Sequence, residues 1–188
     1  MLNGSDSKIS ITILVDNTLS GLHSGPGLAT EHGLAYWVTA NGFSMLFDTG
    51  QTDAIVQNSR ALGVPLNAAK TVVLSHGHYD HTGGLPHVYH AFGCECLFLH
   101  PDAALGHYRR LDEPPHKDIS MPPESREIVD RWVKQKVWTS APMRLSDGVW
   151  VTGPVPRCNS FEDVGGPFYR DPECTAPDAI ADDQALWL

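Results

Sequence analysis

The feature that most constrains this chain is a group of three histidines and one aspartate within six consecutive positions. These residues belong to SHGHYDHTGG (residues 75–84), called the histidine loop below, which directly follows the apolar run TVVL. A short apolar run of this kind predicts a buried strand. The glycines at 77, 83 and 84 allow the chain to turn sharply after it. A loop held between a buried strand and a helix keeps its side chains fixed, as a metal site requires.

The spacing of the four side chains suits metal ligands. His76 and His78 are two positions apart, so both imidazoles can reach one ion, while Asp80 and His81 can reach a second ion beside it. Neutral imidazole and carboxylate suit zinc, and also manganese or iron. The alternative is a run of solvated histidines, which the buried strand before the loop and the glycines within it disfavour. The sequence therefore predicts a site for divalent metal at the histidine loop.

Length and composition bound the class of protein. A chain of 188 residues is long enough for a real core, and we expect a single domain over residues 1–188. The formal net charge of −9 argues against a surface for nucleic acid. No stretch reaches the ~18 apolar residues of a membrane helix, and the first residues lack the apolar core of a signal peptide. Four scattered cysteines then favour reduced thiols and a cytoplasmic location.

The order of apolar and polar residues predicts strands that alternate with helices, which is typical of a mixed α/β fold. Residues 33–39 and 43–47 are joined through Asn41-Gly42, a strong signal for a β-hairpin. We expect further strands at 9–15, 71–74, 94–99, 143–145 and 149–152 and within the final DDQALWL, and helices at 52–62, 85–91 and 125–136.

Several segments together resemble a known family. FDTG at 47–50 followed by the histidine loop is similar to the metallo-β-lactamase superfamily. MLFDTGQTDAIVQNSRALGV, VVLSHGHYDHTGGL, HPDA at 100–103, TGPVPR at 152–157 and DDQAL at 182–186 resemble one branch of it, the 7,8-dihydropterin-6-methyl-4-(β-D-ribofuranosyl)aminobenzene-5′-phosphate synthases. The resemblance implies an α/β fold, the metallo-β-lactamase-like αββα sandwich.

The resemblance also implies roles for particular residues. His76 and His78 would bind a first divalent ion, and Asp80 and His81 a second one. Asp80 would in addition orient the attacking water, which makes it the catalytic candidate. Asp48 in FDTG would hold the metal loop in place from behind the ligands. The N-cap of a following helix is an equally simple interpretation of Asp48.

The chain departs from the family pattern after DDQAL. The family continues with C-x-H-x-G, whose histidine is expected at the metals, whereas this sequence has no histidine after His116. We therefore expect a sandwich that is incomplete at the C-terminus and lacks one ligand. Asp182 and Asp183 are candidate oxygen ligands in its place, although a polar turn before a strand explains them as well. A homodimer or a separate C-terminal partner can supply the rest, and the apolar ALWL end favours such pairing.

Other residues are candidates for contact with a substrate. His23 and His32 belong to a long Gly- and Ser-rich loop before the hairpin, and His100 follows a predicted strand next to the histidine loop. Arg157 can contact an anionic group such as a phosphate. A pocket wall for His100 and an ordinary surface position for Arg157 are the simpler interpretations. We expect the remaining histidines to be surface residues: His87, His90, His107 and His116.

The chemistry that this pattern predicts is metal-assisted. A dinuclear centre activates a water for hydrolysis of an ester, amide or phosphate bond. The narrower branch implies a transferase in methanopterin-type pterin cofactor synthesis instead. A third interpretation is a truncated metal-binding fragment or subunit with weak catalysis. In the first two cases the substrate is a small molecule, phosphorylated or pterin-like.

Overall fold

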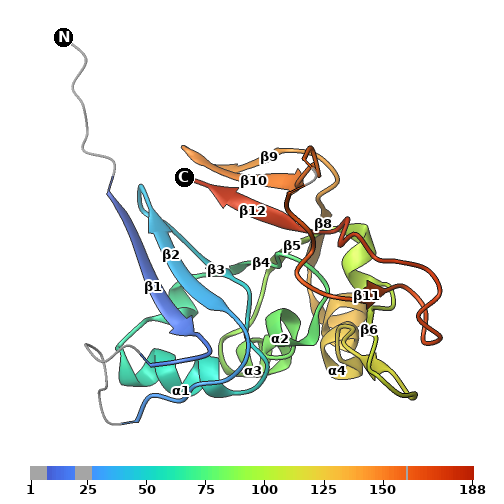
Figure 1. Cartoon of the computed structure of the whole chain (residues 1–188). Coiled ribbons are helices and arrows are strands. Elements are labelled where there is room, and N and C mark those ends of the chain that lie inside the picture. The colour runs from blue at the N-terminus through green and yellow to red at the C-terminus, as the bar shows by residue number, and fades with distance from the viewer. Residues whose placement is uncertain (1–7, 20–26, 160) are drawn as a thin grey trace.

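The computed structural model describes residues 8–19, 27–159 and 161–188, and its largest element is a six-stranded sheet (Figure 1). In spatial order the strands are β1 (Ile9–Val15), β2 (Ala35–Ala40), β3 (Phe43–Phe47), β4 (Thr71–Val73), β5 (Cys96–Leu99) and β8 (Gln135–Trp138). The first three strands pair antiparallel, and β3, β4, β5 and β8 pair parallel. The parallel pairing brings the carboxyl ends of β3, β4 and β5 to one edge of the sheet, where α/β folds place their sites.

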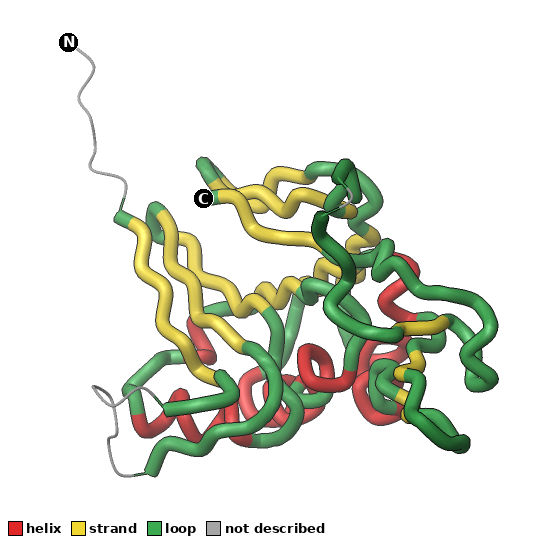
Figure 2. The backbone as a smooth tube through the Cα atoms, in the orientation of Figure 1, coloured by secondary structure: helices red, strands yellow, loops and turns green. Residues whose placement is uncertain are grey.

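A smaller sheet lies against one face of the large one, as Figure 2 shows with the strands of both in yellow. It contains β9 (Met143–Ser146), β10 (Val149–Pro154) and β12 (Gln184–Trp187), with β10 in the middle and both pairings antiparallel. Val38, Met45 and Val73 of the large sheet form a common core with Val149 and Val151 of the smaller sheet.

Helices cover the opposite face of the large sheet (Figure 1). They are α1 (Ala54–Ala61), α2 (Tyr79–Thr82), α3 (Leu85–Phe92) and α4 (Pro123–Glu127), which continues into a π-helical segment at Ile128–Trp132. Successive strand residues point to opposite faces. Met45 and Val73 therefore pack toward the smaller sheet, whereas their neighbours Leu46 and Val72 belong to the core beneath the helices.

Short elements complete the fold. Two 3₁₀ turns lie at Leu66–Ala68 and Pro101–Ala104, and a third sheet consists of β6 (Tyr108–Arg109), β7 (Lys117–Asp118) and β11 (Phe168–Tyr169). This third sheet joins the proline-rich stretch after β5 to a segment about sixty positions later, because β11 pairs with β6 through Phe168 and Arg109.

The β2–β3 hairpin is confirmed. Asn41 and Gly42 both have positive φ, 51° and 82°, as the turn of a two-residue hairpin requires. The predicted helix at 125–136 is wrong at its end, because Val133 is already extended. The chain beyond it joins the edge of the large sheet as β8, starting with the hydrogen bond from Gln135 N–H to the Glu95 carbonyl at 3.0 Å. The sheet edge thus overrides a pattern that suits a helix.

The predicted final strand is present as β12, at the edge of the smaller sheet. Trp187 of β12 pairs with Trp150 of β10, and both indoles are exposed on the outer face of that sheet, 70% and 37% respectively. The mixed α/β class is confirmed. Among the residues that the structure describes, none of the helices has the length and apolar character needed to cross a membrane.

Candidate metal centre

The register of two parallel strands places FDTG beside the histidine loop. Phe47 at the end of β3 lies opposite Val73 at the end of β4. The next residues of the two strands therefore leave the sheet side by side, and Asp48 N–H donates to the Val73 carbonyl at 2.8 Å. Two segments that are separate in sequence meet at the carboxyl edge of the sheet, where the histidine loop begins.

Asp48 anchors the histidine loop through hydrogen bonds. Its fully buried carboxylate accepts hydrogen bonds from Ser75 N–H and Ser75 Oγ, both at 2.7 Å, and bonds His81 Nδ1 at 2.7 Å. Asp48 has φ of 60°, a left-handed conformation that Asp tolerates better than most residues. The alternative as a helix cap is wrong, because α1 begins at Ala54 with Asp53 at its N-cap.

The three imidazoles of the loop lie close together. The ring centre of His76 is 4.4 Å from that of His78 and 4.2 Å from that of His81. Burial, with a smaller contribution from neighbouring His107, lowers the pKa of His78 to about 4. Burial and the adjacent His81 lower the pKa of His76 well below its usual value. Both rings are therefore neutral at pH 7, the form that binds metal.

The pKa of His81 is shifted in the opposite direction. Burial lowers the pKa of His81, but the charge and hydrogen bond of Asp48, with Asp80 and Asp183 nearby, outweigh burial and raise the pKa above its usual value. Because Nδ1 faces Asp48, Nε2 points elsewhere and lies 3.6 Å from Asp80 Oδ2. A carboxylate on one imidazole nitrogen is the usual partner of a histidine that binds metal through the other nitrogen.

The catalytic candidate Asp80 lies on α2, which sequence reasoning did not predict. Its Oδ2 atom is 3.2 Å from His32 Nε2, and the His32 side chain is 65% exposed. The early loop therefore brings His32 over the candidate site, as its interpretation as a substrate contact requires. His23, the other candidate in that loop, lies outside the described residues.

The histidine loop contains glycines because other backbone segments lie too close to leave room for a side chain, and not because the chain turns sharply there. A Cβ on Gly77 would lie 2.3 Å from the Ala103 carbonyl oxygen, and one on Gly84 only 2.0 Å from that of Thr49. Neither glycine has positive φ. The same reason applies to Gly33, beside His32, where a Cβ would lie 2.2 Å from the Asp80 carbonyl oxygen.

The two C-terminal aspartates differ in their contacts. Asp182 is fully buried, and its Oδ2 atom accepts a hydrogen bond from Gly77 N–H at 2.8 Å. Asp183 Oδ2 lies 3.2 Å from Arg157 Nη2 in a partly exposed ion pair. Burial and the charge of Asp182 raise the pKa of Asp183, although Arg157 opposes the shift. The residue before β12 that touches the histidine loop through its side chain is therefore Asp182.

The expectation that His107 is a surface residue is wrong. His107 is fully buried, and its ring centre lies 5.1 Å from that of His78. Its Nδ1 atom bonds Asp178 Oδ2 at 2.7 Å. Nothing in the local sequence predicts this, because Asp178 is 71 positions away and the contact depends on the β6–β11 pairing. His87 and His90 are exposed as expected, and His116 is partly exposed.

The side chain of His100 forms a hydrogen bond within its own turn. Its Nδ1 atom accepts a hydrogen bond from Asp102 N–H at 3.1 Å and thereby caps the 3₁₀ turn at Pro101–Ala104. This bond gives His100 a structural role at the carboxyl end of β5, next to the segment that packs on Gly77. Its contact with a substrate stays a prediction.

Comparison with known proteins decides the family. The family model described as the metallo-beta-lactamase superfamily matches residues 29–157, more than half of the chain. The chain belongs to the metallo-β-lactamase superfamily. The match includes both FDTG and the histidine loop, so the shared segment is the one that forms the carboxyl edge described above.

Two curated relatives come from Methanocaldococcus jannaschii. The uncharacterized protein MJ0448 is 28% identical over 153 residues, 81% of this chain and 56% of the relative. The 7,8-dihydropterin-6-methyl-4-(β-D-ribofuranosyl)-aminobenzene-5′-phosphate synthase is 27% identical over 137 residues, 67% of this chain and 45% of the relative. The chain thus spans about half the length of the curated relatives that it matches.

Two solved metallo-β-lactamases align with part of this chain. The Rm3 metallo-β-lactamase is 24% identical with a TM-score of 0.46, covering 69% of this chain and 48% of that chain. MIM-1 from Novosphingobium pentaromativorans is 17% identical with a TM-score of 0.48, covering 86% of this chain and 51% of that chain.

Members of this superfamily generally bind divalent metal ions, and the donors of the histidine loop fit such ions by their chemistry. The buried Nε2 atom of His78 has no hydrogen-bond partner, although buried polar atoms are nearly always paired. Within residues 8–19, 27–159 and 161–188, no three His, Cys, Asp or Glu side chains are grouped so that they could hold an ion. Ion binding therefore requires the donors to draw closer together.

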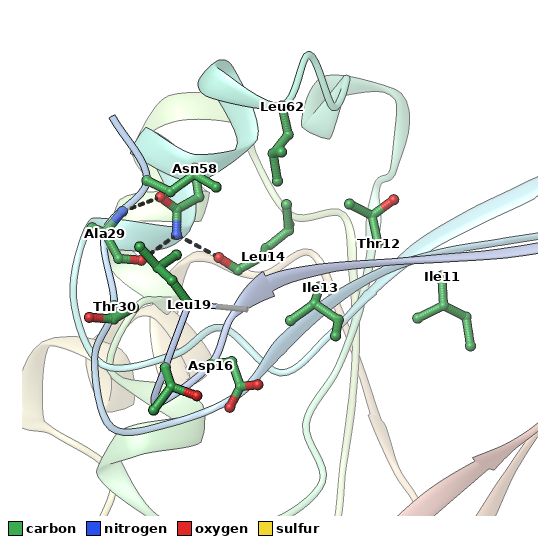
Figure 3. Close-up of a pocket in the computed structure, with 12 residues that line it drawn as sticks. Ile11, Thr12, Ile13, Leu14, Asp16, Leu19, Ala29, Thr30, Asn58 and Leu62 are labelled. Atoms are coloured by element: carbon green, nitrogen blue, oxygen red, sulfur yellow. Dashed lines mark hydrogen bonds between the residues drawn. The ribbon is translucent and has the colours of Figure 1, made fainter. Parts of the chain in front are cut away.

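A pocket of about 430 Å³ lies elsewhere, between the edge strand β1 and α1 (Figure 3). Ile11, Ile13 and Leu62 line it, and Asn58 closes one end by bonding the backbone of Leu14 and Ala29. None of its lining residues belongs to the histidine loop. Its walls are mainly apolar.

Proposed function

We propose that this chain is a metal-dependent enzyme whose dinuclear centre activates water for hydrolysis of an ester, amide or phosphate bond. His76 and His78 would hold a first ion, and Asp80 and His81 a second. Zinc suits this mixture of imidazole and carboxylate, with manganese or iron as alternatives. The substrate would be a small molecule that reaches the carboxyl edge of the large sheet.

The observation that carries this proposal is the pairing of Asp48 with His81. A buried carboxylate fixes Nδ1 of His81 at 2.7 Å and leaves Nε2 directed toward Asp80. Burial keeps His76 and His78 neutral as well. A surface loop of solvated histidines would need neither the buried aspartate nor the close glycine contacts.

Divalent ions in such a site lower the pKa of a bound water and stabilise negative charge that develops on the substrate. The residues of the chain would do the rest. Asp80 would orient the attacking water, and His32, at 3.2 Å from Asp80 Oδ2, would fix that carboxylate and contact the substrate. Arg157 lies beside the same region through its ion pair with Asp183 and can contact an anionic group.

A transferase acting in pterin cofactor synthesis is the second candidate. The similarity to the dihydropterin-ribofuranosyl-aminobenzene phosphate synthase over 67% of this chain favours it. Its substrate would carry a phosphate, for which a guanidinium is a good partner. The Arg157–Asp183 pair would then open when the phosphate binds.

Turnover of chromogenic substrates tests the hydrolase. The chain is stripped with chelator, reloaded with zinc, manganese or anaerobic ferrous iron, and assayed with p-nitrophenyl acetate, p-nitrophenyl phosphate, bis(p-nitrophenyl) phosphate and a chromogenic β-lactam. We expect metal-dependent turnover of one ester or phosphate class, reduced at least a hundredfold in Asp80→Asn. His87→Ala, an exposed histidine on α3, is the matched control and should keep full turnover.

The outcomes separate the candidates. Equal rates for Asp80→Asn and wild type, or turnover that chelator does not abolish, would contradict the proposal. If the metal-loaded chain hydrolyses none of these substrates but joins a dihydropterin activated by a diphosphate leaving group to a ribosyl-aminobenzene phosphate, with release of diphosphate, the transferase replaces the hydrolase.

A further inference from the structure

Beside the histidine loop lies a second group of buried polar side chains. Its members are His107, which directly precedes β6, Asp178 and Arg170 from the segment around β11, and Asp182 before β12. Three separate parts of the chain therefore meet under His78. His107, Asp178 and Asp182 are all at most 3% exposed.

Four atoms of this region are buried without a hydrogen-bond partner: His78 Nε2, His107 Nε2, Asp182 Oδ1 and Arg170 Nη1. A polar atom that is buried without a partner destabilises the folded chain. Four on neighbouring side chains are unusual, since buried polar atoms are nearly always paired. A shared cation would satisfy the two imidazole nitrogens and the Asp182 oxygen, whereas Arg170 Nη1 can only donate a hydrogen bond.

The separations between these side chains are close to those of ligands on one ion, although no three of the described side chains are grouped tightly enough to hold an ion as they stand. Two imidazoles bound through Nε2 to a tetrahedral ion, with metal–nitrogen bonds of about 2.0 Å, have ring centres roughly 5 Å apart. The ring centres of His78 and His107 are 5.1 Å apart. His107 Nε2 lies 3.8 Å from Asp182 Oδ2. That separation is too long for a hydrogen bond but close to the roughly 3–4 Å between two donors of one ion.

The partners of His107 fix it in the required orientation. Asp178 Oδ2 bonds Nδ1 at 2.7 Å, and Arg170 Nε holds the other carboxylate oxygen of Asp178 at 2.8 Å. With its proton held on Nδ1, the ring has the lone pair of Nε2 free on the side of Asp182. Asp182 is itself anchored by Gly77 N–H.

We propose that His107 Nε2 is a ligand of a divalent cation that His78 Nε2 and the Asp182 carboxylate also bind, and that Asp178 positions His107 for this role. The assignment rests on the proposed metal-dependent function and adds two residues from outside the histidine loop to its first metal position. Zinc suits this set of two imidazoles and one carboxylate.

A competing explanation is a structural ion pair, in which protonated His107 bridges Asp178 and Asp182 without any metal. The two explanations differ in metal binding. If His107 binds an ion, His107→Gln loses that ion. If His107 only forms an ion pair, His107→Gln changes the stability of the chain and leaves metal binding unchanged. His116→Gln is the matched control, because His116 lies near the same third sheet and its Nδ1 atom only accepts Leu111 N–H at 3.2 Å.

The test measures zinc per chain by elemental analysis and the zinc dissociation constant by competition with a chromophoric chelator. Wild type, His107→Gln, Asp178→Asn and His116→Gln are compared, with circular dichroism in chelator to establish folding. We expect His107→Gln to lose one ion or bind it at least a hundredfold more weakly. Asp178→Asn should keep the stoichiometry with 10–100-fold weaker binding, and His116→Gln should match wild type.

A second measurement does not depend on the variants folding. Zinc added to ¹⁵N-histidine-labelled wild type should shift the Nε2 resonance of His107. An unchanged resonance, or a folded His107→Gln that retains both the stoichiometry and the affinity of wild type, overturns the assignment of His107 alone. Wild type that takes up no zinc overturns the proposed function together with it.

Discussion

The Asp182 carboxylate accepts a hydrogen bond from Gly77 N–H at 2.8 Å, although 105 positions separate the two residues. Two positions later, Gln184 N–H donates to the Ser75 carbonyl at 3.0 Å and Gln184 Nε2 to the Leu74 carbonyl at 2.8 Å. The chain before and at the start of β12 therefore closes directly onto the histidine loop. The histidine loop is therefore contacted both by Asp48, which precedes it in the sequence, and by the segment before β12.

Gln184 should stabilise this closure. It is 2% exposed, and its Oε1 atom accepts a hydrogen bond from Thr139 Oγ1 at 2.6 Å. Gln184→Leu removes both side-chain bonds and leaves buried partners unpaired, so we expect a loss of about 2–4 kcal/mol in the free energy of unfolding. Urea denaturation measures it. The control Gln57→Leu, at an exposed position of α1, should change stability by less than about 0.5 kcal/mol; equal effects would contradict the role of Gln184.

Asp48 should control metal affinity without binding metal itself. Asp48→Asn keeps the shape of the side chain but removes the charge that fixes His81 Nδ1. Loss of such a partner weakens metal binding about 10–100-fold. Zinc competition with a chelator measures this, and Asp53→Asn is the control, since Asp53 is exposed and makes no side-chain cap bond. An unchanged zinc affinity in Asp48→Asn would contradict this role.

The metal-free chain should lose stability as the pH falls from 7 to 5. His78 has a pKa of about 4 when folded and an ordinary pKa of about 6.5 when unfolded. Between these values the unfolded state binds more protons, so stability rises with pH and is lost as pH falls through this window. His76 acts in the same direction, whereas His81, with its raised pKa, acts in the opposite one.

The expected contribution of His78 is roughly 2 kcal/mol between pH 7 and pH 5. Chemical denaturation in the presence of chelator, repeated across this range, measures it. His78→Gln should flatten the dependence, and the exposed His87→Gln should leave it unchanged. If His78→Gln retains the full slope of wild type, the burial of a neutral His78 is not its cause.

Close backbone contact should make Gly84 intolerant of any side chain. In Gly84→Ala the new Cβ would meet the Thr49 carbonyl oxygen at 2.0 Å, so the backbone must shift, with an expected loss of about 2 kcal/mol or more. Gly63→Ala, where φ is 66° and no atom lies within 4 Å of the new Cβ, should lose only about 1 kcal/mol. Thermal unfolding compares the two, and a smaller loss at Gly84 would argue against the contact.

The sequence predicts those features whose causes are local. The apolar run before the histidine loop is a buried strand, and Asn41-Gly42 forms the hairpin turn because both positions require positive φ. The resemblance to a family placed Asp48 behind the loop, and the parallel register of β3 and β4 explains why it lies there.

Features that depend on contacts between residues far apart in the sequence could not be predicted. His107 belongs to GHYRR, a polar stretch typical of a surface, and its burial depends on the contact with Asp178 far along the chain. The helical pattern at 125–136 was likewise overridden, because residues from Gln135 onward complete the hydrogen bonding of β5. The glycines of the histidine loop were correctly singled out, but their reason is the proximity of other backbone segments.

The most direct test is the number of ions that the histidine loop holds. The wild-type chain is stripped with chelator, reloaded with excess zinc, dialysed and analysed for zinc per chain, beside a His76→Ala/His78→Ala variant and the exposed control His87→Ala/His90→Ala. We predict about two ions for wild type and for the control, and at least one fewer for the loop variant. Equal zinc content in the loop variant and wild type, or none in wild type, would contradict a metal centre at this loop.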